Sequence, residues 1–146
     1  MLITIPLTLL LVATCVFLHY ETLQASNAWL PRLSFVRPRA RVLVAFVAAM
    51  ASHLAHVLLF AAALYFLQGA AGVGRLSGKI ENVFPTFLYF SLETYTSLGF
   101  GDVYPLGAIR LIAGVETLMG LLLISWTASF TYLEMARYWS APPPQR

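Results

Sequence analysis

Residues 93–105 are the chemically most distinctive part of the chain and read Glu-Thr-Tyr-Thr-Ser-Leu-Gly-Phe-Gly-Asp-Val-Tyr-Pro. The two glycines, Gly99 and Gly101, stand at alternate positions. Glycine adopts left-handed backbone dihedrals at little steric cost, so this spacing allows successive carbonyl oxygens to point toward one axis. Such carbonyls can replace the water around a dehydrated cation without the trapping strength of a full negative charge. The spacing therefore permits a loop that presents successive main-chain oxygens to one side.

The segments around this loop are hydrophobic enough to lie in a membrane. The 146 residues are 60% hydrophobic and 10% charged, whereas an ordinary soluble domain has about 25% charged residues. The runs 2–18, 42–67 and 111–133 come close to or exceed the roughly 20 apolar residues of a membrane-spanning helix. Lipid offers the backbone no hydrogen bonds, so these runs are predicted to be helices. The composition argues against a soluble enzyme, a disordered chain or a nucleic-acid-binding protein.

A fourth apolar stretch, residues 84–95, is too short to span a bilayer. Pro85 suits the first turn of a helix. A glycine-rich link at 69–78 precedes the stretch, and the glycine-containing loop follows it. We therefore predict a re-entrant helix, which membranes tolerate only inside protein or beside a water-filled cavity.

The basic residues indicate an orientation. The larger group lies between the first two runs and after the third, and consists of Arg32, Arg37, Arg39, Arg41, Arg137 and Arg146. The other side carries Arg75, Lys79 and Arg110. The positive-inside rule then predicts a multi-pass protein with its N-terminus outside and its C-terminus cytoplasmic. The membrane is expected to be the plasma (inner) membrane. No basic residue precedes the first run, which favours a retained helix over a signal peptide.

Residues 84–138 resemble the pore region of potassium channels. The filter of that family reads Thr-Val-Gly-Tyr-Gly-Asp or close variants, and residues 97–102 here read Ser-Leu-Gly-Phe-Gly-Asp. Thr94 and Thr96 also match the approach to that filter. The resemblance implies an all-α membrane protein with three transmembrane helices plus a re-entrant pore helix and a selectivity-filter loop. The implied organisation is an N-terminal transmembrane helix and cytoplasmic linker at 1–41 and a pore domain at 42–146, comprising outer helix 42–67, pore helix 84–96, filter 97–102 and inner helix 108–137.

The family builds its pore from four such loops, so the resemblance implies a homotetramer in membrane lipid. It implies passive, potassium-selective conduction, with K⁺ as the transported ion, no cofactor, no enzyme activity and no nucleic-acid partner. The altered filter leaves a weakly selective monovalent cation channel as one alternative. Gating is expected to come from the filter, the inner helix, the lipid, protons or an unseen regulatory partner.

The expected ion ligands are main-chain carbonyls, with the Ser97 hydroxyl at the inner end. The predicted ion-binding residues are Ser97, Leu98, Gly99, Phe100 and Gly101. The side chains of Leu98 and Phe100 are expected to point away from the ions into packing that fixes the diameter of the filter.

The residues expected to support the filter are Glu93, Thr94, Thr96 and Asp102, with Tyr89 and Phe90 as an aromatic cuff. In some family members a glutamate pairs with the filter aspartate, and Glu93 and Asp102 occupy those positions. Two close carboxyls do not both ionise readily, so such a pair would retain a proton. The alternative is that Asp102 faces outside water and Glu93 finds another donor.

The last helix resembles the inner helix that lines the pore. Gly120 falls near the position of the family's gating hinge, although close helix packing would also explain a glycine there. Helical spacing predicts a cavity-lining stripe, with Tyr132 as a constriction, made of Leu121, Ile124, Ala128 and Tyr132.

Four polar side chains within or beside the apolar runs need an explanation. Glu116 would cost roughly 3 kcal/mol if ionised at the centre of a span, so it should be protonated, paired, or facing protein or water. His53 and His56 share one helical face, and they form either a metal or pH-sensing site with Glu116, as in an intramembrane metalloprotein, or bonds to neighbouring helices. No third ligand lies at helical spacing, which favours the second interpretation, and His19 is expected at the membrane interface. The single cysteine, Cys15, excludes an intrachain disulfide.

Overall fold

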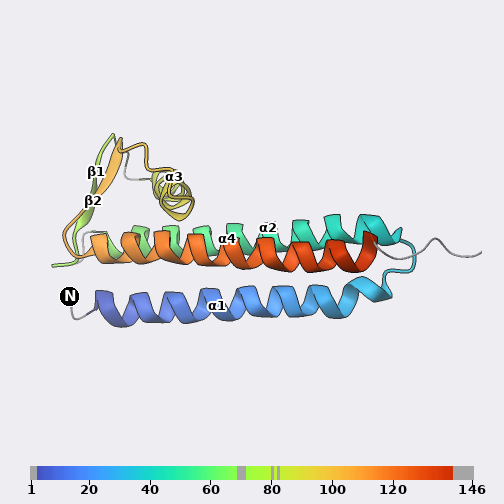
Figure 1. Ribbon diagram of the computed structural model, residues 1–146. Helices are drawn as coiled ribbons and strands as arrows, with labels where there is room; N and C mark the ends of the chain where they lie inside the picture. Colours follow the sequence, from blue (N-terminus) through green and yellow to red (C-terminus); the bar gives the residue numbers. More distant parts are fainter. Residues whose placement is uncertain (1–2, 69–71, 80, 82, 140–146) are drawn as a thin grey trace, which may run out of the picture.

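The computed structural model describes residues 3–68, 72–79, 81 and 83–139. The tail 141–146, including Arg146, and the first part of the glycine-rich link lie outside the described residues. Three long helices, α1 (Thr4–Trp29), α2 (Pro38–Leu67) and α4 (Ile109–Trp139), pack side by side (Figure 1). They contain 26 to 31 residues, so each is about 39 to 47 Å long. Each is long and apolar enough to cross a membrane.

Helix α1 continues well beyond the apolar run at 2–18. Its buried positions recur every three or four residues and include His19, Leu23 and Ser26 in the second half. This spacing keeps one face of the helix against α2 and α4 although the sequence there is less hydrophobic. Packing of this face against the other helices, rather than a continuous apolar run, therefore accounts for the length of α1.

The connection between α1 and α2 lies at the same end of the bundle as the last turns of α4 (Figure 1). A short 3₁₀ helix, η1 (Leu30–Arg32), ends α1. The guanidinium group of Arg41 donates to the carbonyls of Leu33 and Val36, at 2.9 and 3.3 Å, and lies over the ring of Tyr138. Arg41 thus fastens the connection to the end of α4.

Helix α3 (Phe84–Tyr95) crosses the three long helices steeply, and Figure 1 shows it nearly end-on. Pro85 lies in its first turn, as predicted. Phe87 and Phe90 of α3 are buried in the main hydrophobic core, together with Phe60 of α2 and Ile112 of α4. These contacts attach the short helix to one end of the bundle.

A two-stranded antiparallel sheet that the sequence did not predict lies beside α3. Strand β1 (Arg75–Gly78) pairs with β2 (Val103–Leu106), from Arg75 opposite Leu106 to Gly78 opposite Val103. Each strand has four residues and contains glycine or proline, so neither shows a clear strand pattern. The sheet joins the chain before α3 to the chain after the glycine-containing loop, and so closes a compact unit around that loop.

Candidate functional site

The loop at 97–101 has left-handed backbone dihedrals at alternate residues. The φ angles are +56° at Ser97, +54° at Gly99 and +79° at Gly101. The two glycines were predicted to adopt this conformation, but Ser97 was not, because a residue other than glycine rarely does. The alternation therefore extends one step further toward α3 than the glycines alone indicate.

The N–H groups of the loop point back to the end of α3. The N–H of Ser97 donates to the Thr94 carbonyl at 3.0 Å. The carbonyl oxygen of Glu93 accepts from the N–H of Leu98 at 2.8 Å and from that of Gly99 at 3.4 Å. The carboxyl group of Glu93 accepts from the Phe100 N–H at 3.2 Å. Among the described residues, by contrast, the carbonyl oxygens of 97–101 accept no hydrogen bond, so they are available as ligands.

The two carboxyls beside the loop have different donors. Oδ1 of Asp102 accepts from the Tyr89 hydroxyl at 3.1 Å and from the Val103 N–H at 3.1 Å. Glu93 is buried, and its carboxyl group accepts a hydrogen bond from the Phe100 N–H. Burial raises the pKa of Glu93; the Phe100 N–H lowers it, and the charge of Asp102 raises it again. Glu93 therefore has a donor other than Asp102, as in the alternative to a pair of carboxyls that shares a proton.

The last turn of α3 contacts α4 closely. The Thr117 hydroxyl donates to the Thr94 carbonyl at 3.1 Å. A Cβ atom at Gly120 would overlap the backbone carbonyl of Tyr95. Helix α4 runs through Gly120 without interruption, so close packing accounts for this glycine. The hydroxyls of Thr96 and Ser97 donate to the carbonyls of Leu92 and Thr96, both at 2.7 Å.

Several residues predicted to act at the pore lie on the open surface of a single chain. The side chains of Leu98 and Phe100 are 59% and 67% exposed, so no packing within this chain covers them. Phe90 is an exception, because this residue of the expected aromatic cuff is buried within the single chain. All four members of the predicted cavity stripe are exposed, and three of them line an apolar groove of about 500 Å³ between α2, α3 and α4, namely Ile124, Ala128 and Tyr132.

A family model described as "ion channel" matches residues 52–135, which are 84 of the 146 residues. The chain belongs to this ion channel family. No match to the chain was found among curated proteins or among solved structures. Membership of the ion channel family, together with three helices long enough to span, makes the chain a membrane protein. The predicted fold class and the resemblance to channel pore domains are thereby confirmed.

The matched segment begins within α2 and ends within α4, so it includes α3, the loop and the sheet. Helix α1 lies outside the part that defines the ion channel family. It nevertheless packs along both α2 and α4.

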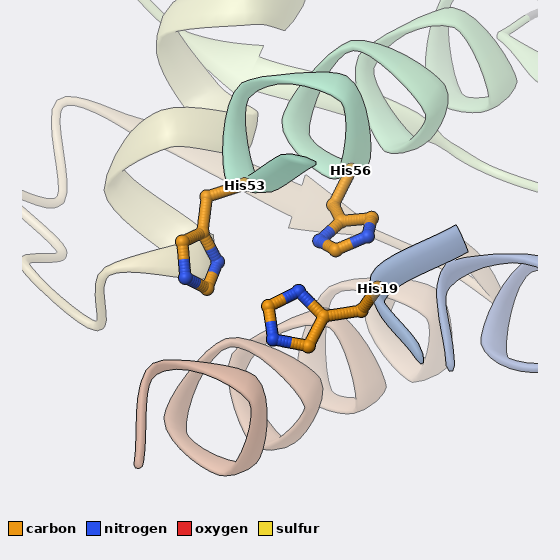
Figure 2. Close-up of side chains that lie close together, drawn as sticks. All are labelled: His19, His53 and His56. Atoms are coloured by element: carbon orange, nitrogen blue, oxygen red, sulfur yellow. The ribbon is translucent and has the colours of Figure 1, made fainter. Parts of the chain in front are cut away.

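The histidines are arranged differently from the prediction. His19 is fully buried and lies beside His53 and His56, with candidate ligand nitrogens all within 4.8 Å of one another (Figure 2). The expectation of an interfacial His19 is wrong because α1 continues to Trp29 and packs His19 against α2 and α4. The third imidazole belongs to a different helix, so spacing along α2 could not identify it.

Glu116 is not part of this group. It is fully buried, and one of its carboxyl oxygens accepts a hydrogen bond from the Ser91 hydroxyl, while Oε2 has no partner among the described residues. The Ser91 hydroxyl also lies 2.9 Å from the Val57 carbonyl. Glu116 therefore faces protein between α3 and α2, one of the predicted arrangements, and the suggested combination of Glu116 with His53 and His56 is wrong.

Proposed function

We propose that this ion channel conducts K⁺ passively and selectively through a filter formed by the carbonyl oxygens of residues 97–101. The proposal rests on a difference between the N–H groups of this loop, which are hydrogen-bonded, and its carbonyl groups, which are not. The N–H groups of Leu98, Gly99 and Phe100 are bound by Glu93, whereas the carbonyls of 97–101 bind nothing within the described part of the chain. A loop braced in this way presents oxygens to a cation without needing to rearrange.

A single loop cannot surround an ion, so the pore is proposed to be a homotetramer. Support comes from the exposed side chains of Leu98 and Phe100, which lie beside the proposed ligands and need cover from neighbouring copies. The exposed stripe on α4 that contains Ile124 and Tyr132 would then face the central cavity. Transport would follow the ion gradient and would need no cofactor.

The orientation is proposed to place the connection between α1 and α2 in the cytoplasm of a cell with this protein in its plasma membrane. Basic residues in the connection and in the first turn of α2 support this choice, namely Arg32, Arg37, Arg39 and Arg41. The filter and the sheet, at the opposite end of the bundle, would then lie toward the outside.

The test is ion flux into liposomes that contain the purified protein, comparing K⁺, Rb⁺, Na⁺ and Li⁺, with Ba²⁺ as blocker. K⁺ and Rb⁺ are expected to enter and Ba²⁺ to stop them. Gly99→Ala should abolish flux, because Gly99 has a φ of +54° that alanine tolerates poorly. Gly114→Ala is the matched control, since Gly114 lies within helix α4 and its added Cβ would meet open space.

Equal entry of K⁺ and Na⁺ would instead identify a weakly selective monovalent cation channel. Flux that persists in Gly99→Ala at the level of Gly114→Ala would contradict a carbonyl filter at this loop.

A further inference from the structure

Three imidazoles from two helices meet in the interior of the bundle. The ring centres of His19 and His53 lie 5.1 Å apart, those of His19 and His56 5.6 Å, and those of His53 and His56 6.0 Å. Figure 2 shows the three side chains converging on one space, His19 from α1 and the other two from α2. In an apolar bundle each buried polar group of such a cluster needs a hydrogen-bond partner.

Two hydroxyls each bridge a pair of these imidazoles. The Tyr95 hydroxyl, at the end of α3, lies 2.7 Å from Nδ1 of His53 and 3.3 Å from Nδ1 of His56. The Thr127 hydroxyl, on α4, lies 2.8 Å from Nε2 of His53 and 3.2 Å from Nε2 of His19. The cluster thus receives groups from every long helix and from α3.

A third hydroxyl completes a closed ring of six hydrogen bonds. Oγ of Ser52 lies 3.2 Å from Nδ1 of His19 and 3.4 Å from Nε2 of His56. Every imidazole nitrogen in the cluster therefore has a hydroxyl neighbour. Neutral imidazoles and hydroxyls have one hydrogen each to donate, so six groups supply the six hydrogens that the ring needs. The arrangement therefore allows all three rings to be neutral with every hydrogen bond made, and neutral imidazole is the form that binds metal.

We propose that His19, His53 and His56 bind one divalent transition-metal ion of the zinc class per chain. Neutral imidazole nitrogens suit Zn²⁺, Cu²⁺ and Ni²⁺, whereas Mg²⁺ and Ca²⁺ require oxygen ligands, and the described cluster contains no carboxylate. Histidines that bind metal usually donate the other ring N–H to an oxygen acceptor. Whichever nitrogen of each ring binds the metal here, the other nitrogen keeps a hydroxyl acceptor.

Metal binding requires the cluster to contract. A tetrahedral Zn²⁺ ion with bonds of about 2.0–2.1 Å places its nitrogen ligands about 3.4 Å apart. The candidate ligand atoms lie up to 4.8 Å apart. Small rotations of the side chains and an approach of α1 toward α2 would close this difference, so the bound ion would fasten α1 to the pore domain.

The test measures Zn²⁺ binding to the full-length protein in detergent, purified without a histidine tag and treated with a chelator. Equilibrium dialysis is expected to give one bound Zn²⁺ per chain. His19→Gln, His53→Gln and His56→Gln should each weaken binding at least tenfold, because glutamine can hydrogen-bond but is a poor zinc ligand. Glu21→Gln is the matched control on α1: Glu21 is exposed, and its replacement should leave binding unchanged.

Helical content and the size of the assembly are checked for every variant. Because a variant can fail to fold, X-ray absorption at the zinc edge of the unaltered protein provides a second measurement, which should show imidazole nitrogens around the metal. No binding by the unaltered protein, equal binding by the three folded variants, or a metal environment without imidazole would overturn the proposal. None of these readouts involves ion flux, so the result is independent of the proposed conduction.

Discussion

The buried carboxyl group of Glu93 accepts a hydrogen bond from the backbone N–H of Phe100 at 3.2 Å. This contact joins the last turn of α3 to the middle of the glycine-containing loop. Hydrogen bonds to charged groups are stronger than those between neutral groups, and this one holds the Phe100 N–H toward α3. Glu93 is therefore the residue that we expect to control the shape of the loop.

Glu93→Ala should destabilise the protein by about 1–3 kcal/mol, since the Phe100 N–H loses its acceptor. The loss should be visible as a lower midpoint of thermal unfolding of the purified protein. Glu93→Gln retains an oxygen acceptor and serves as the control, and it should be at least as stable as the unaltered protein. Equal losses for the two variants would show that the hydrogen bond is unimportant.

The raised pKa of Glu93 predicts a pH dependence of stability. An acid whose pKa is higher in the folded state binds more protons when folded, so its contribution to stability falls as the pH rises. The ordinary value is 4.5. The unaltered protein should therefore match Glu93→Gln most closely near pH 4 and lose stability relative to it as the pH rises above this value. Unfolding midpoints of both proteins between pH 4 and 8 test this, and a constant difference would contradict it.

Gly120→Ala should destabilise the protein by about 1–3 kcal/mol, because the added methyl group overlaps the Tyr95 carbonyl and must push α3 away from α4. Gly114→Ala lies in the same helix with free space around the added Cβ, so it should be neutral or stabilising by up to about 1 kcal/mol. Thermal unfolding of both variants compares them directly. A stable Gly120→Ala protein with altered gating would instead favour the hinge interpretation.

Tyr95→Phe removes the hydroxyl shared by His53, which is half-buried, and His56, which is buried. The change should cost about 1–3 kcal/mol, since one nitrogen of each imidazole loses its partner. Tyr20→Phe, at an exposed position of α1, should change the free energy of unfolding little. Chemical denaturation of the purified assembly measures both. Equal stabilities of the two variants would show that the ring of hydrogen bonds contributes nothing.

The parts of the site that depend on local sequence could be predicted. Alternate glycines indicated left-handed dihedrals at Gly99 and Gly101, and Pro85 indicated the beginning of α3. The left-handed conformation of Ser97 could not be predicted in the same way, because it depends on hydrogen bonds to α3 rather than on the residue type. Leu98 and Phe100 remain uncovered in one chain, and their packing is a prediction that depends on neighbouring copies.

Features that join distant segments were the hardest to predict. His19 meets the other histidines only because α1 packs along α2 in one particular register, which periodicity within either helix does not determine. The strand pairing of 75–78 with 103–106 likewise depends on the way α3 folds back between them. The hydrophobic runs indicated which segments span, but not which faces of the helices meet.

Anomalous X-ray diffraction from crystals of the assembled protein, grown with Rb⁺ or Tl⁺ in place of K⁺, tests the central claim most directly. The account predicts a column of ions on the symmetry axis, each surrounded by carbonyl oxygens of residues 97–101 from four copies of the chain. An assembly in which these oxygens face away from the axis, or an axis without ions at this level, would contradict it.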